Sequence, residues 1–431
     1  MKRRRFGRGM EIFLREGVQH KHSHLTEMQK LEFYEVDKLE LKEDRGIQYR
    51  SPIFNAALAC EIHHVEPATY AAMRNFDETP MIAKGYSPLE RGLIVDAMLD
   101  RFGDYRVLSI DHARFDAHVS EKLLQIFFQF LLRVRRYPPR LKRWLKWMMK
   151  CKGFSRGGIV YEILAKVKSG DLPTALGNCA MNWGILLSFF MDLFIAAGLC
   201  TRPEAYEFVL EHVSFFIDGD DSQIIIAEWI FRKFPDLVDR IVAHCLKLGM
   251  VTEVELHDDI RKAAFCQSKL IYTKHGPVMV RDPRKVLDVL TKCPRKVEPE
   301  WRANAVLAAS ALGELMQAPG IPVISVAAAA MCRASGQKPM FLTPDDWGRF
   351  QVYQTVGVLE EVDDSCRVDF EIAWGISVSE QLALEDYYRN IAHGSLPIRF
   401  PHPKTKVVQF DIWDDCVTWV FPPTMQNNWW R

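Results

Sequence analysis

The sequence lacks the marks of several common protein classes. Its ten cysteines form no CxxC pair, which excludes a zinc ribbon and a dithiol redox motif. It contains no GxxxxGK[ST] phosphate loop, no fixed-period repeat and no low-complexity tract. The first residues are basic, but no apolar run with a cleavage site follows them, so we expect no secretory signal. The scattered cysteines fit a reducing compartment.

An excess of charge of one sign is also missing. The chain has 431 residues, with 56 basic and 55 acidic side chains and a formal net charge of +1. The whole-chain charge therefore does not point to a polyanionic partner, and any nucleic-acid surface must be local. With 48% hydrophobic and 26% charged residues, the composition is that of a globular protein. Its length predicts several subdomains.

One stretch, residues 181–200, is long enough and apolar enough to resemble a membrane span. Asn182 and Asp192 lie within it, and polar side chains are unfavourable in a lipid-facing helix. A helix that is apolar on all sides is also typical of a protein core. We therefore predict a core helix and no transmembrane segment.

Short-range patterns predict both strands and helices. Residues 105–111 (YRVLSID) are typical of a buried strand, and residues 121–150 show helical periodicity that Pro138-Pro139 interrupts. In VSFFIDGDDSQIIIA, two β-rich runs flank a tight turn that requires the conformational freedom of Gly219. From about residue 294 the pattern is mostly helical. Together these patterns predict an α+β protein.

The acidic turn between these strands suggests a metal site. Adjacent carboxylates repel one another unless a cation neutralises them, and oxygen ligands suit Mg²⁺ or Mn²⁺. Asp111, at the end of the earlier strand, supplies a further carboxylate. With Asp220 it could bridge two metal ions in a phosphoryl transfer, and Asp221 could assist. A solvent-exposed hairpin tip is the alternative.

Polar residues that could recognise a ribose follow the same strand and open a later helix. Asp116 lies five residues after Asp111, and Thr174 and Asn178 share one helix face in SGDLPTALGN. Ser169-Gly170 is expected to form a flexible loop before that helix. This face could bind a 2′-hydroxyl, which both donates and accepts hydrogen bonds. Alternatively, Asp116 is a helix N-cap and the others face water.

A charge-rich stretch, LKEDRGIQYRS, lies within residues 36–60, where we expect a loop or an edge hairpin. It contributes Lys42, Arg45 and Arg50. These cations could bind a nucleoside triphosphate, because arginine makes two-pronged contacts to phosphate. A surface loop whose charges are merely solvated is the alternative.

The order of these motifs resembles that of viral RNA-dependent RNA polymerases. The likeness covers residues 38 to about 390 and is closest to tombusvirus-like replicases of positive-strand RNA viruses. The segments that carry it are IQYRSPIFN, KGYSPLERG, DHARFDAHVS, SGDLPTALGNC, DGDD, FCQS, RDPRKVL and AWGISVSEQLALEDYY.

The resemblance implies a right-hand fold with fingers, a palm built on an antiparallel sheet with flanking helices, and a helical thumb. The N-terminal region and fingers, with a basic nucleotide-entry loop, would cover residues 1–104. The palm would cover residues 105–293, with a fingers insertion at about 121–168. The thumb would cover residues 294–431.

Carried over by position, the resemblance also implies residue roles. Asp111 and Asp220 would hold two Mg²⁺ or Mn²⁺ ions with Asp221 beside them. The other implied roles are ribose selection by Asp116, Thr174 and Asn178, triphosphate binding by Arg45 and Arg50, and a position near the primer grip for Cys266 and Gln267. Two positions depart from the pattern: Val167 stands where relatives usually have arginine, and Glu253 where they often have a lysine that acts as general acid.

The resemblance implies template-directed RNA synthesis, replicating a viral RNA genome. The expected partners are RNA template, nascent RNA and nucleoside triphosphates, together with a membrane-anchoring replication protein that holds the chain in membrane-associated complexes in the host cytoplasm. A reverse transcriptase is a second reading, disfavoured by Asp116 and Asn178. A non-catalytic RNA-binding scaffold is a third, although Asp111, Asp220 and Asp221 are all present.

Overall fold

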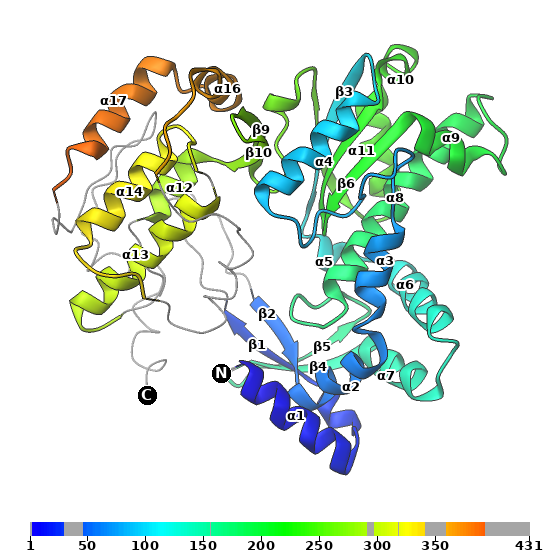
Figure 1. Ribbon diagram of the computed structural model, residues 1–431. Coiled ribbons are helices and arrows are strands. Elements are labelled where there is room, and N and C mark those ends of the chain that lie inside the picture. The colour runs from blue at the N-terminus through cyan, green and yellow to red at the C-terminus, as the bar shows by residue number, and fades with distance from the viewer. Residues whose placement is uncertain are drawn as a thin grey trace. The chain divides into compact units, whose positions relative to one another are not determined.

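The computed structural model describes residues 2–29, 46–155, 157–290, 297–317, 319–340 and 359–392. The chain divides into two units (Figure 1). Unit 1 takes the described residues within 1–30, 44–84 and 97–259, and unit 2 takes those within 85–96 and 260–431. Lys42 and Arg45 lie outside the described residues.

Unit 1 contains a four-stranded antiparallel sheet in the order β6-β7-β3-β8. Its strands are β6 (Val213–Asp218), β7 (Asp221–Ala227), β3 (Tyr105–Ala113) and β8 (Val251–His257). The predicted strand at 105–111 and the predicted hairpin around Gly219 are thus both confirmed. Side chains alternate across each strand, so the sheet has an apolar face and a face that carries carboxylates.

Helices cover the apolar face of this sheet. Phe190 of α8 (Thr174–Ala196) packs edge-on against Phe215 of β6, with ring centroids 6.2 Å apart. Both rings belong to a large apolar core that also includes Ile241 of α11 (Leu237–Lys247). Within the described chain, α8 alone is long and apolar enough to cross a membrane, and half of its apolar window is buried inside the protein. It occupies the position predicted for a core helix.

A second sheet of unit 1 has the order β2-β1-β4-β5. Strand β1 (Leu25–Gln29) pairs antiparallel with β2 (Gly46–Arg50) and parallel with β4 (Lys150–Ser155), which pairs antiparallel with β5 (Val160–Leu164). Strand β2 lies at the edge of this sheet and within the stretch where a loop or an edge hairpin was expected, but its partner β1 precedes that stretch. Close to this sheet are α1 (Lys2–Glu16), α2 (Pro52–Ile62) and α7 (Pro139–Met149) (Figure 1).

The predicted break at Pro138-Pro139 separates α6 (Glu121–Val134) from α7. Proline cannot donate the backbone hydrogen bond of a helix interior, so one helix ends before the pair and the next begins at Pro139. The shorter elements of unit 1 are η1 (His20–Ser23), α3 (Val65–Ala72), α5 (Phe115–His118), α9 (Ala205–His212) and α10 (Glu228–Lys233). Helix α4 (Pro88–Asp100) contains the boundary between the units.

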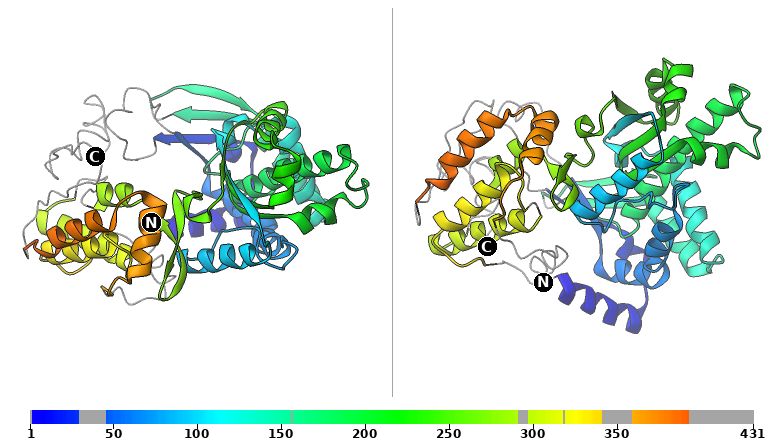
Figure 2. Two further views of the ribbon diagram at one scale, coloured as in Figure 1. Left: turned by 90° about the horizontal axis from the view of Figure 1, so that it is seen from above. Right: turned by 45° about the horizontal axis from the view of Figure 1, so that its top comes forward.

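Unit 2 has a hairpin of β9 (Ser268–Thr273) and β10 (Gly276–Arg281) and a separate apolar core. Its other elements are η3 (Ile260–Lys262), α12 (Pro283–Leu290), α13 (Glu300–Gln317), α14 (Ile324–Ala334), α16 (Asp364–Trp374) and α17 (Val378–Arg389). The yellow and orange helices of Figure 2 belong to this unit. The helical pattern predicted after residue 294 is confirmed for the described residues. The implied boundary at residue 294 stays a prediction.

A buried ion pair joins two of these helices. Arg367 of α16 donates to both carboxylate oxygens of Glu385 of α17, at 2.8 and 3.0 Å. The Glu385 side chain is completely buried and also accepts from the Val323 amide, at 3.0 Å, and from Arg389, at 2.8 Å. Every oxygen of this buried carboxylate therefore has a hydrogen-bond donor.

Candidate active site

The acidic turn joins β6 and β7 by a two-residue loop. Asp218 and Asp221 face each other as the last pair of the hairpin, and Gly219 and Asp220 form the loop. Gly219 has a φ of +76°, whereas Asp220 keeps a negative φ. Glycine at the first central position with φ above zero is the pattern of a type II′ turn. The predicted need for glycine here is confirmed.

The register of the sheet places two more carboxylates beside this turn. Ile110 of β3 pairs with Ser222 of β7, so Asp111 lies one position further along, next to Asp221. On its other side, Asp111 pairs directly with Glu253 of β8. Directly paired residues share a face of the sheet, and Asp111 and Glu253 are both exposed. The departure at Glu253 thus adds a carboxylate where a lysine was expected.

Lys84, which had no role in the sequence motifs, neutralises part of this negative charge. The Lys84 ammonium pairs with the Asp218 carboxylate. Backbone hydrogen bonds place this lysine, because the segment before it runs along β6, with Ala83 donating to Ile217 at 2.9 Å and Ile217 donating to Met81 at 2.8 Å. Only the segment KGYSPLERG pointed to it in the sequence, and nothing there linked it to the turn.

The donor chemistry of the turn suits a hard divalent cation. Asp111, Asp220 and Asp221 offer only carboxylate oxygens, the ligands that Mg²⁺ and Mn²⁺ prefer. Within the described ranges, no three histidine, cysteine, aspartate or glutamate side chains are close enough to form a metal-binding group. Mg²⁺ commonly binds through one or two carboxylates, its waters and the substrate phosphates. The residues therefore fit the ion by chemistry, without a preformed protein cage.

A buried polar network supports the turn from the apolar side of the sheet. The Asn182 amide of α8 donates to the carbonyls of Gly219 at 3.0 Å and Asp220 at 2.9 Å, and to the Ser222 hydroxyl at 2.9 Å. Its own oxygen faces His112 Nε2 at 3.1 Å, and His112 Nδ1 lies 2.8 Å from the Thr252 hydroxyl. These contacts join α8, β3 and β8 to the turn.

The network fits a neutral histidine. Burial lowers the pKa of His112, against opposing effects from Asn182 and the nearby carboxylates. With Nε2–H donating to Asn182 and Nδ1 accepting from Thr252, all these polar groups have partners. In the sequence Asn182 served only as an argument against a membrane span. A polar residue in an otherwise apolar helix was the signal that could have identified its role.

Two of the three predicted ribose-selecting residues lie together. The Asn178 amide donates to the Asp116 carboxylate at 2.7 Å, and Asp116 lies inside α5, not at its N-cap. The Asn178 side chain is 8% exposed, and its oxygen has no hydrogen-bond partner among the described residues. Thr174 is not part of this pair, since its hydroxyl donates to the Lys168 carbonyl at 2.7 Å.

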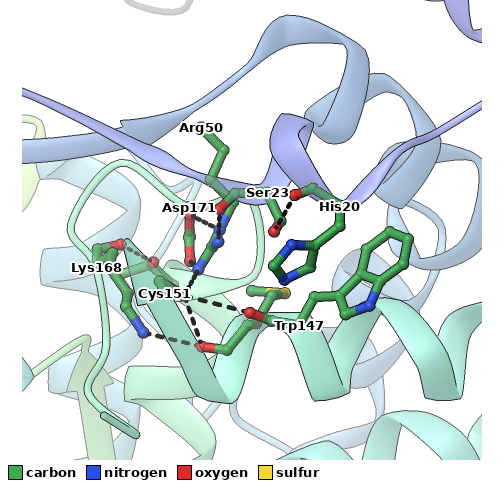
Figure 3. Close-up of polar contacts among 9 residues, drawn as sticks. His20, Ser23, Arg50, Trp147, Cys151, Lys168 and Asp171 are labelled. Carbon is green, nitrogen blue, oxygen red and sulfur yellow. Dashed lines mark hydrogen bonds and ion pairs between the residues drawn. The ribbon is translucent and has the colours of Figure 1, made fainter. Parts of the chain in front are cut away.

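Arg50 does not face a nucleotide in this structure. Its side chain is 1% exposed and makes a two-pronged ion pair with Asp171, at 2.7 and 3.0 Å (Figure 3). It also donates to the Ser23 carbonyl and to Cys151 Sγ, the latter at 3.3 Å. All its donor groups therefore face protein atoms. Binding of a triphosphate by Arg50 requires this ion pair to open.

The loop predicted to be flexible at Ser169-Gly170 is held against β2. The Gly170 amide donates to the Gln48 carbonyl at 2.9 Å. A Cβ at Gly170 would lie 2.5 Å from that same oxygen, so only glycine allows this approach. Next to it, Lys168 is buried and donates to the Met148 carbonyl at 3.1 Å. Burial lowers the pKa of Lys168.

The departure at Val167 leaves an apolar side chain packed against the core of unit 1. The ammonium groups of its two lysine neighbours both bind backbone carbonyls. The Lys166 ammonium donates to the Val119 carbonyl at 3.0 Å, and Lys168 is used as described above.

Cys266 and Gln267 occupy a tight turn in unit 2. Phe265 and Ser268 exchange two backbone hydrogen bonds, of 2.8 and 2.9 Å, across them. Both central residues have positive φ, +50° and +60°, which is the pattern of a type I′ turn. Lys285 donates to the Gln267 side chain at 3.1 Å. The primer-grip role stays a prediction.

Comparison with known proteins gives a consistent family. The family model described as "Viral RNA dependent RNA polymerase" matches residues 2–394. An RNA-directed RNA polymerase of Groundnut rosette virus is 30% identical over 356 residues, covering 80% of this chain and 39% of the relative. Those of Cymbidium ringspot virus and Tomato bushy stunt virus are 28% and 27% identical over 400 residues, covering 89% of this chain and 45% of each relative. The chain thus spans less than half the length of these relatives.

Proposed function

Because the chain belongs to the family of viral RNA-dependent RNA polymerases, we propose that it catalyses template-directed RNA synthesis. An RNA 3′-hydroxyl attacks the α-phosphate of a nucleoside triphosphate, a P–O bond forms, and pyrophosphate leaves. In this proposal the sheet β6-β7-β3-β8 is the palm, the β2-β1-β4-β5 sheet with α6 and α7 belongs to the fingers, and the helices of unit 2 form the thumb.

The carboxylates of the sheet hold two divalent cations. Asp111 and Asp220 are the principal ligands, and Asp221 lies beside them. Bound there, Mg²⁺ or Mn²⁺ supplies the positive charge that stabilises the attacking and leaving oxygens. The chain supplies the positioning: Asn182 fixes the backbone of the turn, and Lys84 holds the neighbouring Asp218.

The observation that carries the preference for ribonucleotides is the unpaired oxygen of Asn178. This buried acceptor lies on the residue that already binds Asp116. A buried polar atom without a partner is unfavourable by about 1–3 kcal/mol. A ribose 2′-hydroxyl donating to Asn178 removes that penalty, whereas a deoxyribose does not. The Asp116–Asn178 pair therefore selects RNA precursors over DNA precursors and disfavours a reverse transcriptase.

The expected partners follow from this reaction. They are the RNA template, the nascent RNA and nucleoside triphosphates. A membrane-anchoring replication protein would hold the chain in membrane-associated complexes of the host cytoplasm.

The test is incorporation of labelled ribonucleotides on a single-stranded RNA template with Mg²⁺ or Mn²⁺. Asp220→Asn keeps the shape of the turn and removes one charge, so we expect incorporation to fall at least about 100-fold. Asp239→Asn on α11, also in unit 1, is the matched control and keeps wild-type activity. A wild-type chain that binds RNA but never extends it, with or without its partner protein, would support the scaffold reading instead.

Sugar selection is measured in the same assay. Asn178→Ala removes the unpaired oxygen, and the ribonucleotide to deoxyribonucleotide ratio of kcat/KM should fall about 5- to 100-fold. An unchanged ratio would remove Asn178 from this role and leave the polymerase proposal standing.

A further inference from the structure

One segment of unit 1 is strongly basic although the chain as a whole is not. Residues 122–161 contain no aspartate or glutamate, in a chain of net charge +1. The basic residues of this segment are Lys122, Arg133, Arg135, Arg136, Arg140, Lys142, Arg143, Lys146, Lys150, Lys152 and Arg156. Such a cluster needs either protein carboxylates or an external anion to balance it.

Protein carboxylates balance only part of the cluster. Glu61, which is buried, takes Arg135 and Arg140. Lys150 faces Glu162 at 3.4 Å. Within the described residues, Lys142, Arg143 and Lys146 at the centre of the segment form no ion pair with an acidic side chain, and Lys152 shares Glu162, its cross-strand partner, with Lys150.

The fold gathers these cations on one surface. Helix α7 buries Leu141, Trp144, Leu145 and Met148 against the core of unit 1. Its exposed side therefore carries Lys142, Arg143 and Lys146. Strand β4 follows directly and exposes Lys152. We call these four residues the α7 basic surface.

Aromatic rings lie among these cations. The Arg143 guanidinium is 5.6 Å from the centre of the Trp147 ring. The His20 ring of η1 packs edge-on against Trp147, with ring centroids 5.4 Å apart (Figure 3). Phe154 of β4 is 39% exposed and packs against His24 at 5.7 Å. Cations spaced among flat rings are the combination that binds single-stranded nucleic acid, since cations bind phosphates and rings stack with bases.

We propose that the α7 basic surface, with Phe154, binds single-stranded RNA outside the carboxylate face of the palm sheet. The exposed length of α7 is about 16 Å, enough for several consecutive phosphates. This surface extends the proposed function from an active site to a second RNA contact. The inference rests on the proposed function only because RNA synthesis is what would bring RNA to this surface.

RNA is favoured over an anionic membrane by the kind of side chains exposed. A bilayer-docking helix exposes large aliphatic residues beside its cations, whereas the exposed positions of α7 are Pro139 and basic residues. Exposed aliphatic side chains occur on α6, at Ile126 and Val134, and on β5, where Val160 pairs with Phe154 and Leu164 pairs with Lys150. The experiment therefore includes a lipid arm.

The experiment measures binding of a labelled oligouridylate to the full chain as a function of salt. The triple variant Lys142→Glu, Arg143→Glu, Lys146→Glu should lose affinity by at least about tenfold, and the salt slope should fall by about 2, since each lost phosphate contact on a single strand contributes about 0.7. The matched control is Arg202→Glu, Lys233→Glu, Lys247→Glu, which reverses three exposed cations elsewhere in unit 1. It should keep most of the wild-type affinity.

A second variant separates stacking from charge. Phe154→Ala leaves the net charge unchanged and removes one ring, so affinity for single-stranded RNA should fall about fivefold or more, with the salt slope unchanged. Equal losses in the two triple variants, or none in the α7 variant, would overturn the proposal. The proposal would also be overturned if the α7 triple variant lost binding to phosphatidylserine vesicles and kept its binding to RNA. If RNA binding depends on α7 but the chain never extends RNA, the proposed function is wrong and the proposal for α7 stands.

Discussion

Two buried arginine–carboxylate pairs in this chain have nearly the same geometry and different surroundings. Arg367 and Glu385 bind at 2.8 and 3.0 Å in unit 2, and Arg50 and Asp171 bind at 2.7 and 3.0 Å in unit 1. The first pair joins two helices to each other. The second joins strand β2 to the loop that precedes α8, the helix that carries Asn178.

The comparison shows that the geometry of an ion pair does not reveal its purpose. Each pair neutralises buried charges, and removing one partner of either pair should strongly destabilise the protein. Only the Arg50–Asp171 pair includes a residue for which the family resemblance implies triphosphate binding. We therefore expect similar effects on stability from the two pairs and different effects on nucleotide binding.

The largest effect should come from removing one partner. Asp171→Ala and Glu385→Ala each leave a buried arginine without its carboxylate, which should cost about 3–5 kcal/mol. Chemical denaturation, with hydrogen exchange of peptides from each unit, would measure and localise the loss. Destabilisation of only one of the two variants would break the comparison.

A smaller effect should come from Gly170→Ala. The new Cβ would meet the Gln48 carbonyl oxygen at 2.5 Å, and a backbone neighbour cannot easily move away. We expect a loss of about 1–3 kcal/mol, with faster exchange of the amides of β2. Gly184→Ala on α8, where a Cβ meets no atom within 4 Å, is the control and should be neutral or stabilising.

Replacing both partners by apolar residues should cost least in stability. Arg50→Met with Asp171→Leu, and Arg367→Met with Glu385→Leu, each remove the buried charges together, and such replacements are often neutral. The first double variant should nevertheless raise the KM for nucleoside triphosphates about tenfold, and the second should leave it unchanged. Steady-state incorporation kinetics would show this, and an unchanged KM in both would place Arg50 outside nucleotide binding.

The pH dependence of stability tests the contribution of the unit 2 ion pair, Arg367–Glu385. Burial raises the pKa of Glu385, but hydrogen bonds from Arg367 and Val323 outweigh it and leave the pKa below its ordinary value. The unfolded state therefore takes up a proton first as pH falls. The stabilisation by Glu385 is complete above about pH 4.5 and is lost as pH falls through its folded pKa. Glu385→Gln should flatten this acid limb in thermal melts, whereas Glu371→Gln should not.

Local features of this fold were predictable from the sequence, and distant pairings were not. The break at Pro138-Pro139 and the turn at Gly219 each follow from a conformational constraint that the residue carries with it. Asp171, in contrast, is separated from Arg50 by 121 positions. Arginine is usually exposed, so its sequence context predicted a solvent-facing cation.

In the candidate site, too, the motif residues were predictable from the sequence and the contacts between distant residues were not. The motifs placed Asp111 near Asp220 and Asp116 near Asn178, because their order resembles a known family. They did not indicate His112 and Asn182, which meet across 70 positions behind the turn, or the pairing of Lys84 with Asp218. Such contacts depend on how helices and strands pack in three dimensions, which the residue pattern of one segment does not encode.

The backbone of the acidic turn is already fixed before any substrate arrives. Two consecutive carbonyls bind one buried amide, and the type II′ geometry leaves the loop no spare residue. The conformational entropy of this loop is therefore lost during folding and not during each round of nucleotide addition. A nucleotide that binds there meets carboxylates on a preorganised backbone, so its binding energy can go into aligning its own phosphates.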